Sequence, residues 1–180
     1  KTEIGSLDDW LQTLGVRVEV APLNASTLPR TAQLFNKTNQ LNLSTRRMGD
    51  TELMAWANEP NHRLWTVSVT DKFGDLGLTG IISVEIDGDH GRIVDYVLSC
   101  RVMGRKVEET MLAVAVDYAR SLGLREVAAV YLPTAKNKPT LDFFKRSGFA
   151  YVEDTQTFTW ATNDPYPVPK GIELAVGEAI

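Results

Sequence analysis

The alternation of hydrophobic and polar residues predicts a chain in which strands and helices follow one another closely. Residues 16–23 alternate with period two, which predicts a strand. Apolar residues at helical spacing follow in residues 28–40 and 51–59. Three further strand-like runs, separated by turn-forming residues, cover residues 63–71, 77–87 and 91–102. We therefore expect one strand, two helices and then three antiparallel strands.

The second half of the chain predicts helix, strand, helix and strand. An apolar helical face begins at Val107 and stops at Gly123. Residues 126–132 are too apolar and β-branched for a surface segment, so we expect a buried strand there. A short helix in residues 140–147 and a final strand in residues 149–162 complete the pattern. The expected units are a lead-in helix or linker (1–15), one domain (16–162) and a proline-containing, weakly structured tail (163–180).

Composition narrows the class of protein. A chain of 180 residues with 43% hydrophobic residues is long enough for one domain with its own core. The net charge of -4 gives no general attraction to nucleic acid, and no apolar run approaches the ~20 residues of a membrane span. The one cysteine excludes an internal disulfide framework, and His62 and His90 stand alone, so we expect no metal. We expect a cytoplasmic protein, and the start at Lys1 indicates a piece of a longer chain.

A cluster of positive charge lies where the third of the antiparallel strands meets the long helix. We call residues 101–107 the anion turn. A helix start attracts anions, because its first N–H groups lack partners within the helix and its dipole is positive there. The alternative is that a glycine and a few basic residues at a strand-to-helix turn form an ordinary loop that binds no anion. The residues of this turn expected to surround an anion are Arg101, Val102, Gly104, Arg105, Lys106 and Val107.

The order of elements resembles the GCN5-related N-acetyltransferase (GNAT) fold. That resemblance implies an α/β (α+β) domain, with a mixed, mostly antiparallel, twisted sheet and helices on both faces. In that fold an R/Q-x-x-G-x-G/A turn binds the pyrophosphate of coenzyme A, and Lys106 stands here at the last position. A second pattern is matched by Asn137, Phe144, Gly148 and Phe149, which implies cofactor contacts for Asn137 and Phe144. The strand before the turn and residues 126–132 should separate at their ends and leave a tunnel for a pantetheine arm.

Four runs carry a closer resemblance: "KTNQLNLSTRR", "DKFGDLGLTG", "LSCRVMGRKVE" and "YLPTAKNKPTLDFFKRSGF". They are similar to the C-terminal GNAT-like half of FkbH-like proteins of polyketide biosynthesis. In that family an upstream half of the haloacid dehalogenase type takes a glyceryl group from 1,3-bisphosphoglycerate. The group then passes to the phosphopantetheine thiol of an acyl carrier protein. This chain has no D-x-D-x-[TV] motif before Val16, so the resemblance implies that the upstream half is a missing partner.

The family resemblance also suggests where an acyl group is bound. The polar run between the first two helices of the domain would overhang the acceptor side of the cleft. Its amides, hydroxyls and guanidinium groups suit a hydroxylated acyl group or a phosphate. A solvated helix end with local caps explains the same residues equally well. The candidate substrate-binding residues are Asn39, Asn42, Thr45, Arg46 and Arg47.

Cys100 and Asp95 are the candidate catalytic residues. Cys100 directly precedes Arg101, so its thiol would lie near the cofactor thioester and could accept an acyl group, helped by the nearby cations. The alternative is a small buried hydrophobe. Asp95 lies further back on the same strand, where a carboxylate is either a base or a structural partner of another polar group.

Three functions therefore remain open. The first is an acyltransferase-type domain that handles a glyceryl or related hydroxyacyl thioester and delivers it to an acyl carrier protein. The second is a GNAT enzyme that uses acetyl-coenzyme A to acylate a small amine. The third is a non-catalytic module that docks a carrier protein. Phosphopantetheine or coenzyme A is the expected cofactor in each case, because all three rest on the same cleft.

Overall fold

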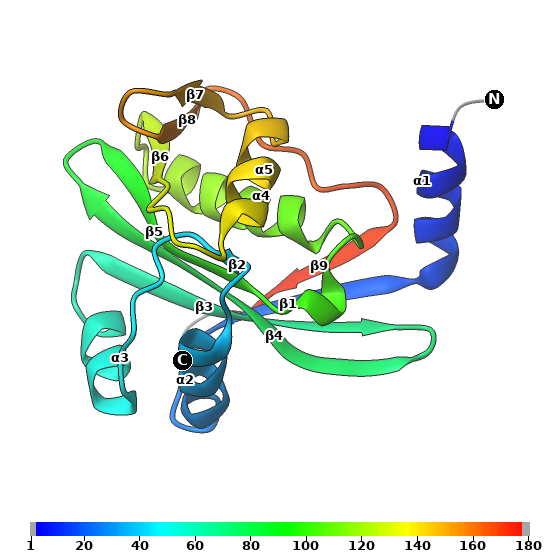
Figure 1. Cartoon of the computed structure of the whole chain (residues 1–180), viewed down its shortest axis with the longest axis horizontal. Helices are drawn as coiled ribbons and strands as arrows, with labels where there is room; N and C mark the ends of the chain where they lie inside the picture. Colours follow the sequence, from blue (N-terminus) through cyan, green and yellow to red (C-terminus); the bar gives the residue numbers. More distant parts are fainter. Residues whose placement is uncertain (1–2, 178–180) are drawn as a thin grey trace.

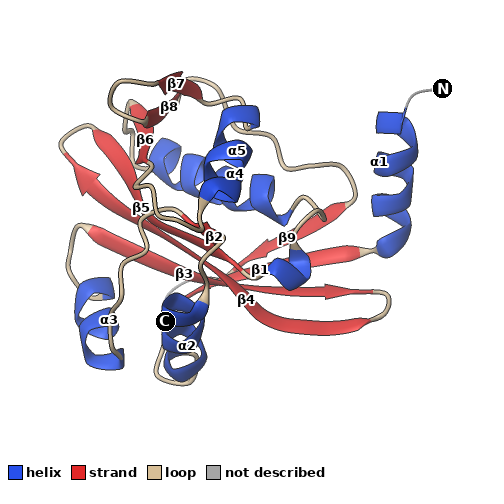
Figure 2. Cartoon of the chain, in the orientation of Figure 1, coloured by secondary structure: helices blue, strands red, loops and turns tan. Residues whose placement is uncertain are grey.

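The structure, a computed structural model, describes residues 3–177 as one mixed sheet with helices on both faces (Figures 1 and 2). The order of strands across the sheet is β7-β8-β6-β5-β4-β3-β1-β9, and β2 pairs with β5 outside this path. The strands are β1 (Val16–Pro22), β2 (Leu41–Asn42), β3 (His62–Asp71), β4 (Gly74–Asp87), β5 (His90–Leu98), β6 (Glu126–Val130), β7 (Ala150–Val152), β8 (Thr157–Ala161) and β9 (Ile172–Val176).

Two sets of helices cover the sheet. The helices are α1 (Glu3–Leu14), α2 (Leu28–Lys37), α3 (Asp50–Ala57), α4 (Val107–Ser121) and α5 (Lys138–Arg146), with a short 3-10 helix η1 (Cys100–Val102). One apolar cluster joins α4 and α5 to the sheet, and Leu11 and Leu14 of α1 belong to it. A smaller cluster joins α2 and α3 to the opposite face (Figure 1). No helix in the described part of the chain is both long and apolar enough to cross a membrane.

The centre of the sheet follows directly from the sequence pattern. β3, β4 and β5 run antiparallel and are joined by short turns. Their alternating apolar residues face both helix layers, so that both surfaces of these strands are buried. The register slips once between Ser83 and Val84, opposite the middle of β5. This irregularity lies beside Asp95, a position where a bulge can redirect a side chain.

β5 and β6 are parallel neighbours that pair only at their beginnings. Residues 90–93 pair with residues 126–129, and the pairing ends there although β5 continues to Leu98. The predicted separation of these strands at their carboxyl ends is confirmed. The end of β5, beside the start of η1, is thus not paired with β6, and the functional hypotheses depend on this region.

Two expectations from the sequence are wrong. Residues 149–162 form two strands, β7 and β8, which pair antiparallel as a hairpin. The tail is also more ordered than its prolines indicate, because β9 pairs in parallel with β1 over residues 172–176. A parallel edge strand needs an unpaired neighbour far away in the sequence, and the local pattern of the tail carries no information about such a neighbour.

Candidate functional site

The opening between β5 and β6 is filled by the chain itself. β2 pairs antiparallel with the last two residues of β5. Leu43, directly after β2, donates its N–H to the carbonyl of Tyr96 at 3.1 Å, and its own carbonyl accepts the N–H of Leu132 at 3.1 Å. Leu41 and Leu43 are 1% and 0% exposed and belong to the main apolar cluster. The expected open tunnel is therefore wrong for this structure, because residues 41–43 bridge the two diverging strands.

Residues at the start of α5 hold this segment in place. The Thr140 hydroxyl accepts the N–H of Asn42 at 3.0 Å and donates to the carbonyl of Gln40 at 2.8 Å. Asn137 donates to the carbonyl of Asn42 at 2.9 Å. Both Asn137 and Phe144 are fully buried. In this structure the two residues expected at the cofactor thus support β2 and the core, respectively.

The anion turn is occupied by an acidic side chain of its own helix. The N–H of Gly104 donates to the carboxylate of Glu108 at 3.1 Å. Glu108 is 4% exposed, and its second carboxylate oxygen has no hydrogen-bond partner within the described residues. Burial raises the pKa of the Glu108 carboxyl, while hydrogen bonds from backbone N–H groups, including that of Gly104, act in the opposite direction. A carboxylate therefore stands where the resemblance implied a pyrophosphate.

The cations of the turn are directed at other partners. Arg101 donates to the carbonyl of Leu76 at 3.2 Å, and Arg105 donates to the carbonyl of Arg101 at 2.7 Å. Arg105 also lies 3.8 Å from the Asp71 carboxylate. Because these guanidinium groups cap backbone carbonyls of the chain, they are not gathered around a common anion position.

Lys106 begins α4 with a left-handed backbone, at φ 63°. Glycine adopts this conformation without strain, whereas lysine pays a steric cost. The lysine Nζ lies 3.6 Å from the Asp8 carboxylate of α1. Val102 and Val107 are buried in the main cluster, so the two valines of the turn contribute packing. In this arrangement the residues present do not fit coenzyme A.

Cys100 is an exposed thiol in η1, just beyond the end of β5. Its Sγ donates to the side-chain carbonyl of Gln40 at 3.2 Å. The alternative of a buried hydrophobe is therefore wrong, and the accessibility that an acyl acceptor needs is present. The second candidate, Asp95, lies back within β5, about 10 Å from the strand end at ~3.3 Å per residue. The two catalytic candidates are thus on different parts of the cleft.

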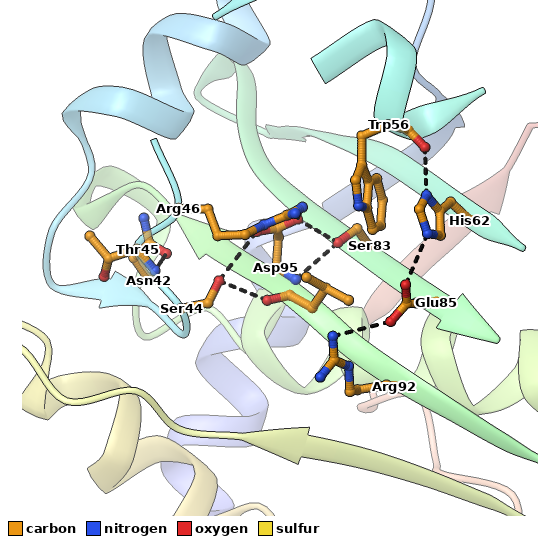
Figure 3. Close-up of polar contacts among 11 residues, drawn as sticks. Asn42, Ser44, Thr45, Arg46, Trp56, His62, Ser83, Glu85, Arg92 and Asp95 are labelled. Atoms are coloured by element: carbon orange, nitrogen blue, oxygen red, sulfur yellow. Dashed lines mark hydrogen bonds and ion pairs between the residues drawn. The ribbon is translucent and has the colours of Figure 1, made fainter. Parts of the chain in front are cut away.

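Asp95 is fully buried in a complete set of hydrogen bonds (Figure 3). Arg46 binds it through two nitrogens, with Nε 3.0 Å from Oδ1 and an Nη 2.6 Å from Oδ2. The Ser83 hydroxyl donates to Oδ2 at 2.7 Å and accepts the N–H of Asp95 at 2.9 Å. The Ser44 hydroxyl donates to the carbonyl of Val94 at 2.8 Å and lies 3.3 Å from Oδ1 of Asp95. These bonds correspond to the structural pairing that we weighed against a catalytic base.

A stack of side chains extends this network across the sheet. The guanidinium of Arg46 lies 4.7 Å from the centre of the Trp56 ring, and His62 stacks on Trp56 with ring centres 3.9 Å apart. His62 contacts the carbonyl of Trp56 at 2.7 Å and Glu85 at 3.0 Å. Arg92 donates to Glu85 at 3.1 Å (Figure 3). Asp95 and Glu85 are thereby joined through the side chains of Arg46, Trp56 and His62.

The remaining residues of the polar run mostly bind the chain itself. Arg47 donates to the carbonyl of Phe35 at 2.7 Å near the end of α2 and to the side chain of Asn39 at 2.6 Å. Asn42, 1% exposed, accepts the N–H of Thr45 at 2.8 Å. Thr45 has a left-handed backbone, at φ 50°, and a buried hydroxyl without a partner among the described residues. Local capping thus accounts for Asn39, Asn42 and Arg47, but not for Arg46.

A small pocket opens where β5 and β6 diverge. Its volume is about 190 Å³, and Ser44, Arg46 and Arg92 supply its polar groups. Aliphatic side chains form the rest of its wall, namely Ile93, Val94, Val130 and Leu132. A larger cavity of about 610 Å³ lies between α4, β3 and β9, and none of the predicted site residues lines it. In the described part of the chain, no group of three or more His, Cys, Asp and Glu side chains could hold a metal ion.

Sequence reasoning missed several residues of this site. Glu108 could have been suspected, because acidic residues favour the first turn of a helix. The alternation of leucines in "LNL" within a polar run was a weak sign of a short strand. Ser83, Glu85 and Arg92 gave no such sign, because their role depends on strand register.

Solved structures with this fold include N-acetyltransferases. Spermidine N-acetyltransferase from Vibrio cholerae, in complex with CoA and spermine, matches with a TM-score of 0.60 at 15% identity, over 81% of this chain and 96% of that chain. Ribosomal-protein-S18-alanine N-acetyltransferase from Escherichia coli matches with a TM-score of 0.57 at 8% identity, over 81% of this chain and 94% of that chain. A domain from Methanocaldococcus jannaschii matches with a TM-score of 0.63 at 12% identity, over 81% of this chain and 99% of that chain.

No protein-family model and no curated protein matches the sequence. At the identities of the structural matches, the likeness establishes the fold and nothing narrower. The chain has the GNAT fold, as predicted: a mixed, mostly antiparallel sheet with helices on both faces. Proteins with this fold include N-acetyltransferases, and the fold alone does not determine what this chain does.

Proposed function

We propose that this domain handles a short hydroxylated acyl group, of the glyceryl type, carried as a thioester on the phosphopantetheine of an acyl carrier protein. The observation that carries this proposal is the pocket where β5 and β6 diverge. A volume of about 190 Å³ suits a small group and is below the usual range of ~300–1,000 Å³ for drug-sized ligands. Guanidinium and hydroxyl donors match acyl hydroxyl and carbonyl oxygens, and the aliphatic walls match its carbon chain.

The charge of the pocket favours this acyl group over a polyamine. An amine acceptor is a cation at neutral pH, and acidic side chains would bind it. The charged side chains that line the pocket are Arg46 and Arg92. The carboxylates nearest to them, Asp95 and Glu85, are already paired with these two arginines. A neutral or anionic oxygen-rich group is therefore the better chemical partner.

The anion turn distinguishes a carrier-borne arm from coenzyme A. The phosphopantetheine of a carrier protein has a single phosphate, which joins it to the carrier, and it lacks the pyrophosphate and adenosine of coenzyme A. Because Glu108 occupies the Gly104 N–H, the lack of a free pyrophosphate site disfavours coenzyme A more than a carrier. The pocket lies at the other end of the opening from this turn, so a carrier could present its acyl group there from outside.

A second candidate function is acetyl-coenzyme A-dependent N-acetylation of a small amine. The structural matches favour it, because two of them are N-acetyltransferases by name. A third, non-catalytic docking of a carrier protein, predicts binding without turnover. In acyl transfer to a thiol such as Cys100, the acyl carbon would leave one sulfur and bond to the other, and the thiol proton would pass to the departing thiolate. That Cys100 is the acceptor thiol in this transfer stays a prediction.

Intact-protein mass spectrometry separates the three functions. The chain is incubated separately with glyceryl carrier protein, with acetyl-coenzyme A plus spermidine, and with 1,3-bisphosphoglycerate. A glyceryl adduct on the chain, or transfer to a second carrier, supports the leading proposal. Acetylspermidine formation supports the second candidate. Binding of carrier without any mass change supports the docking module.

A binding experiment tests the pocket itself. Arg92→Met should weaken binding of glyceryl carrier protein relative to unloaded carrier. Arg125→Met is the matched control, since it also removes an arginine from a surface ion pair, with Asp89, but does not line the pocket. Equal affinity of the wild-type chain for loaded and unloaded carrier would count against the pocket as an acyl site.

A further inference from the structure

We infer that residues 41–43 and Glu108 are internal substitutes for the pantetheine arm and the pyrophosphate of coenzyme A, so that this domain does not take up coenzyme A. The inference stands apart from the proposed acyl group, because it concerns the other parts of the cleft. It rests on two independent sets of contacts. One fills the opening between the strands and the other fills the anion turn.

The backbone of residues 41–43 uses the groups that a pantetheine arm would need. An extended arm between diverging strands must bond to their free backbone groups, since these are the polar groups left on each edge. Here the carbonyl of Tyr96 is taken by Leu43 on the β5 side, and the N–H of Leu132 is taken by Leu43 on the β6 side. Residues 41 and 42 pair with the end of β5. An arm that lies between the two strands at residues 96–98 and β2 therefore exclude each other, whereas the pocket at residues 92–94 stays open to a group presented from outside.

The segment is also held firmly from outside the two strands. Thr140 and Asn137 together make three hydrogen bonds to backbone groups of Gln40 and Asn42, at 2.8–3.0 Å. The side chains of Leu41 and Leu43 are buried in the core. Displacing the segment would break these bonds and expose two leucines to water, so an entering ligand would have to compensate both losses.

At the anion turn, a negative charge is already in place. The Glu108 carboxylate accepts the N–H of Gly104, the group that a pyrophosphate oxygen would use. Pyrophosphate next to an ionised Glu108 would bring like charges together in a poorly hydrated place, which is unfavourable. The cations that could offset this repulsion are bonded to Leu76, Arg101, Asp71 and Asp8.

Thermal unfolding with and without ligand tests the inference on the wild-type chain. Coenzyme A and acetyl-coenzyme A are added separately at increasing concentration, with glyceryl carrier protein in a third series. A ligand at about 100 times its Kd would raise Tm by roughly 5–10 °C for a domain of this size. We expect no shift with either coenzyme. A saturable shift with coenzyme A would overturn the inference, whereas a shift with carrier alone would leave it intact and bear only on the proposed function.

Hydrogen exchange gives a second readout that does not depend on activity. The amides of Asn42, Leu43 and Leu132 should exchange slowly, and coenzyme A should leave their rates unchanged. Faster exchange in residues 40–43 on addition of coenzyme A would show that the ligand displaces β2, and would overturn the inference.

A double variant tests the cause. Glu108→Ala frees the Gly104 N–H, and Thr140→Val removes two bonds to the segment with little change in volume. We expect this variant to gain a Tm shift with coenzyme A. The control pairs Thr140→Val with Glu109→Ala, which removes the neighbouring negative charge but no bond to the turn. A folded double variant that gains nothing would show that these groups are not what excludes the coenzyme. If the variant does not fold, the wild-type measurements decide.

Discussion

The cluster around Asp95 and the anion turn contain the same kinds of charged residue, yet they use them in opposite ways. Asp95 is buried, and Arg46, Ser83 and Ser44 surround its two oxygens. In the turn, Arg101 lies at the surface, and its guanidinium reaches away to a carbonyl of β4. The comparison shows that the same kinds of charged residue form a buried ion pair in one region and cap a backbone carbonyl in the other.

The carboxylates of the two regions differ in a related way. Asp95 has a cationic partner at 2.6 Å. Glu108 is nearly as buried, but within the described residues it has a backbone N–H on one oxygen and no partner on the other. The cluster around Asp95 therefore contains a buried ion pair, whereas the anion turn contains a buried carboxyl group, that of Glu108, which protonation would stabilise. Two changes, at Arg46 and Glu108, should make this difference measurable, and a third tests the exposed thiol of Cys100 beside the turn.

The largest effect is expected from Arg46→Met. It leaves the buried Asp95 carboxylate without its cation, and removal of one member of a buried pair costs about 3–5 kcal/mol of the free energy of unfolding. Urea denaturation at neutral pH measures this loss. Arg101→Met is the control, and as a surface change away from the core it should cost no more than about 0.5 kcal/mol. Similar losses in both variants would contradict the view that the buried Asp95 side chain depends on its bonds from Arg46.

A smaller, pH-dependent effect is expected from Glu108→Gln. Because burial raises the pKa of this carboxyl, the folded chain binds the proton more tightly than the unfolded chain. The contribution to stability is then present below the ordinary carboxyl pKa and is lost as the pH rises through the raised value. Wild type should lose stability relative to Glu108→Gln as the pH rises from about 4 to 7.

Urea denaturation at a series of pH values tests the Glu108 prediction. Glu109→Gln serves as the control for the loss of one negative charge near the start of α4. If the difference in unfolding free energy between wild type and Glu108→Gln stayed constant across this range, burial of Glu108 would have no energetic consequence.

The smallest effect on stability is expected from Cys100→Ser. The thiol is exposed, so the variant should unfold within about 0.5 kcal/mol of wild type, and the native thiol should be alkylated without denaturant. Alkylation that required unfolding would refute this accessibility. In the glyceryl transfer assay, full activity of the folded variant would remove Cys100 from the reaction and leave the pocket near Asp95 as the acyl-handling part.

Most of the fold could be predicted because the hydrophobic periodicity of a long segment indicates whether it forms a helix or a strand. The α4 helix and strands β3 to β6 bury continuous apolar surfaces, and periodicity of this kind depends on neighbours only weakly. β2 and β9 could not be predicted in the same way. β2 is only two residues long, and it is held by residues up to 98 positions away.

The candidate site was predictable by position but not by geometry. Cys100 and Asp95 lie near the opening, as their place in the sequence indicated. What the sequence could not convey is that residues 41–43 would fill that opening, or that Glu108 would fill the turn. In both places a group of the chain bonds to backbone N–H or C=O groups that a ligand could also use. Which group makes these bonds depends on how the strands assemble.

The position of β2 also dictates an order of events during synthesis. Its partners Tyr96, Leu132 and Thr140 all leave the ribosome after it, and Thr140 follows Asn42 by 98 residues. At ~5–20 residues per second, this interval is roughly 5–20 s. For the last 42 residues of that interval, from Leu98 to Thr140, the end of β5 is present as an unpaired strand edge, which other chains can pair with. We therefore expect β2 to dock late, and chaperones that bind nascent chains to contact this edge before the cleft closes.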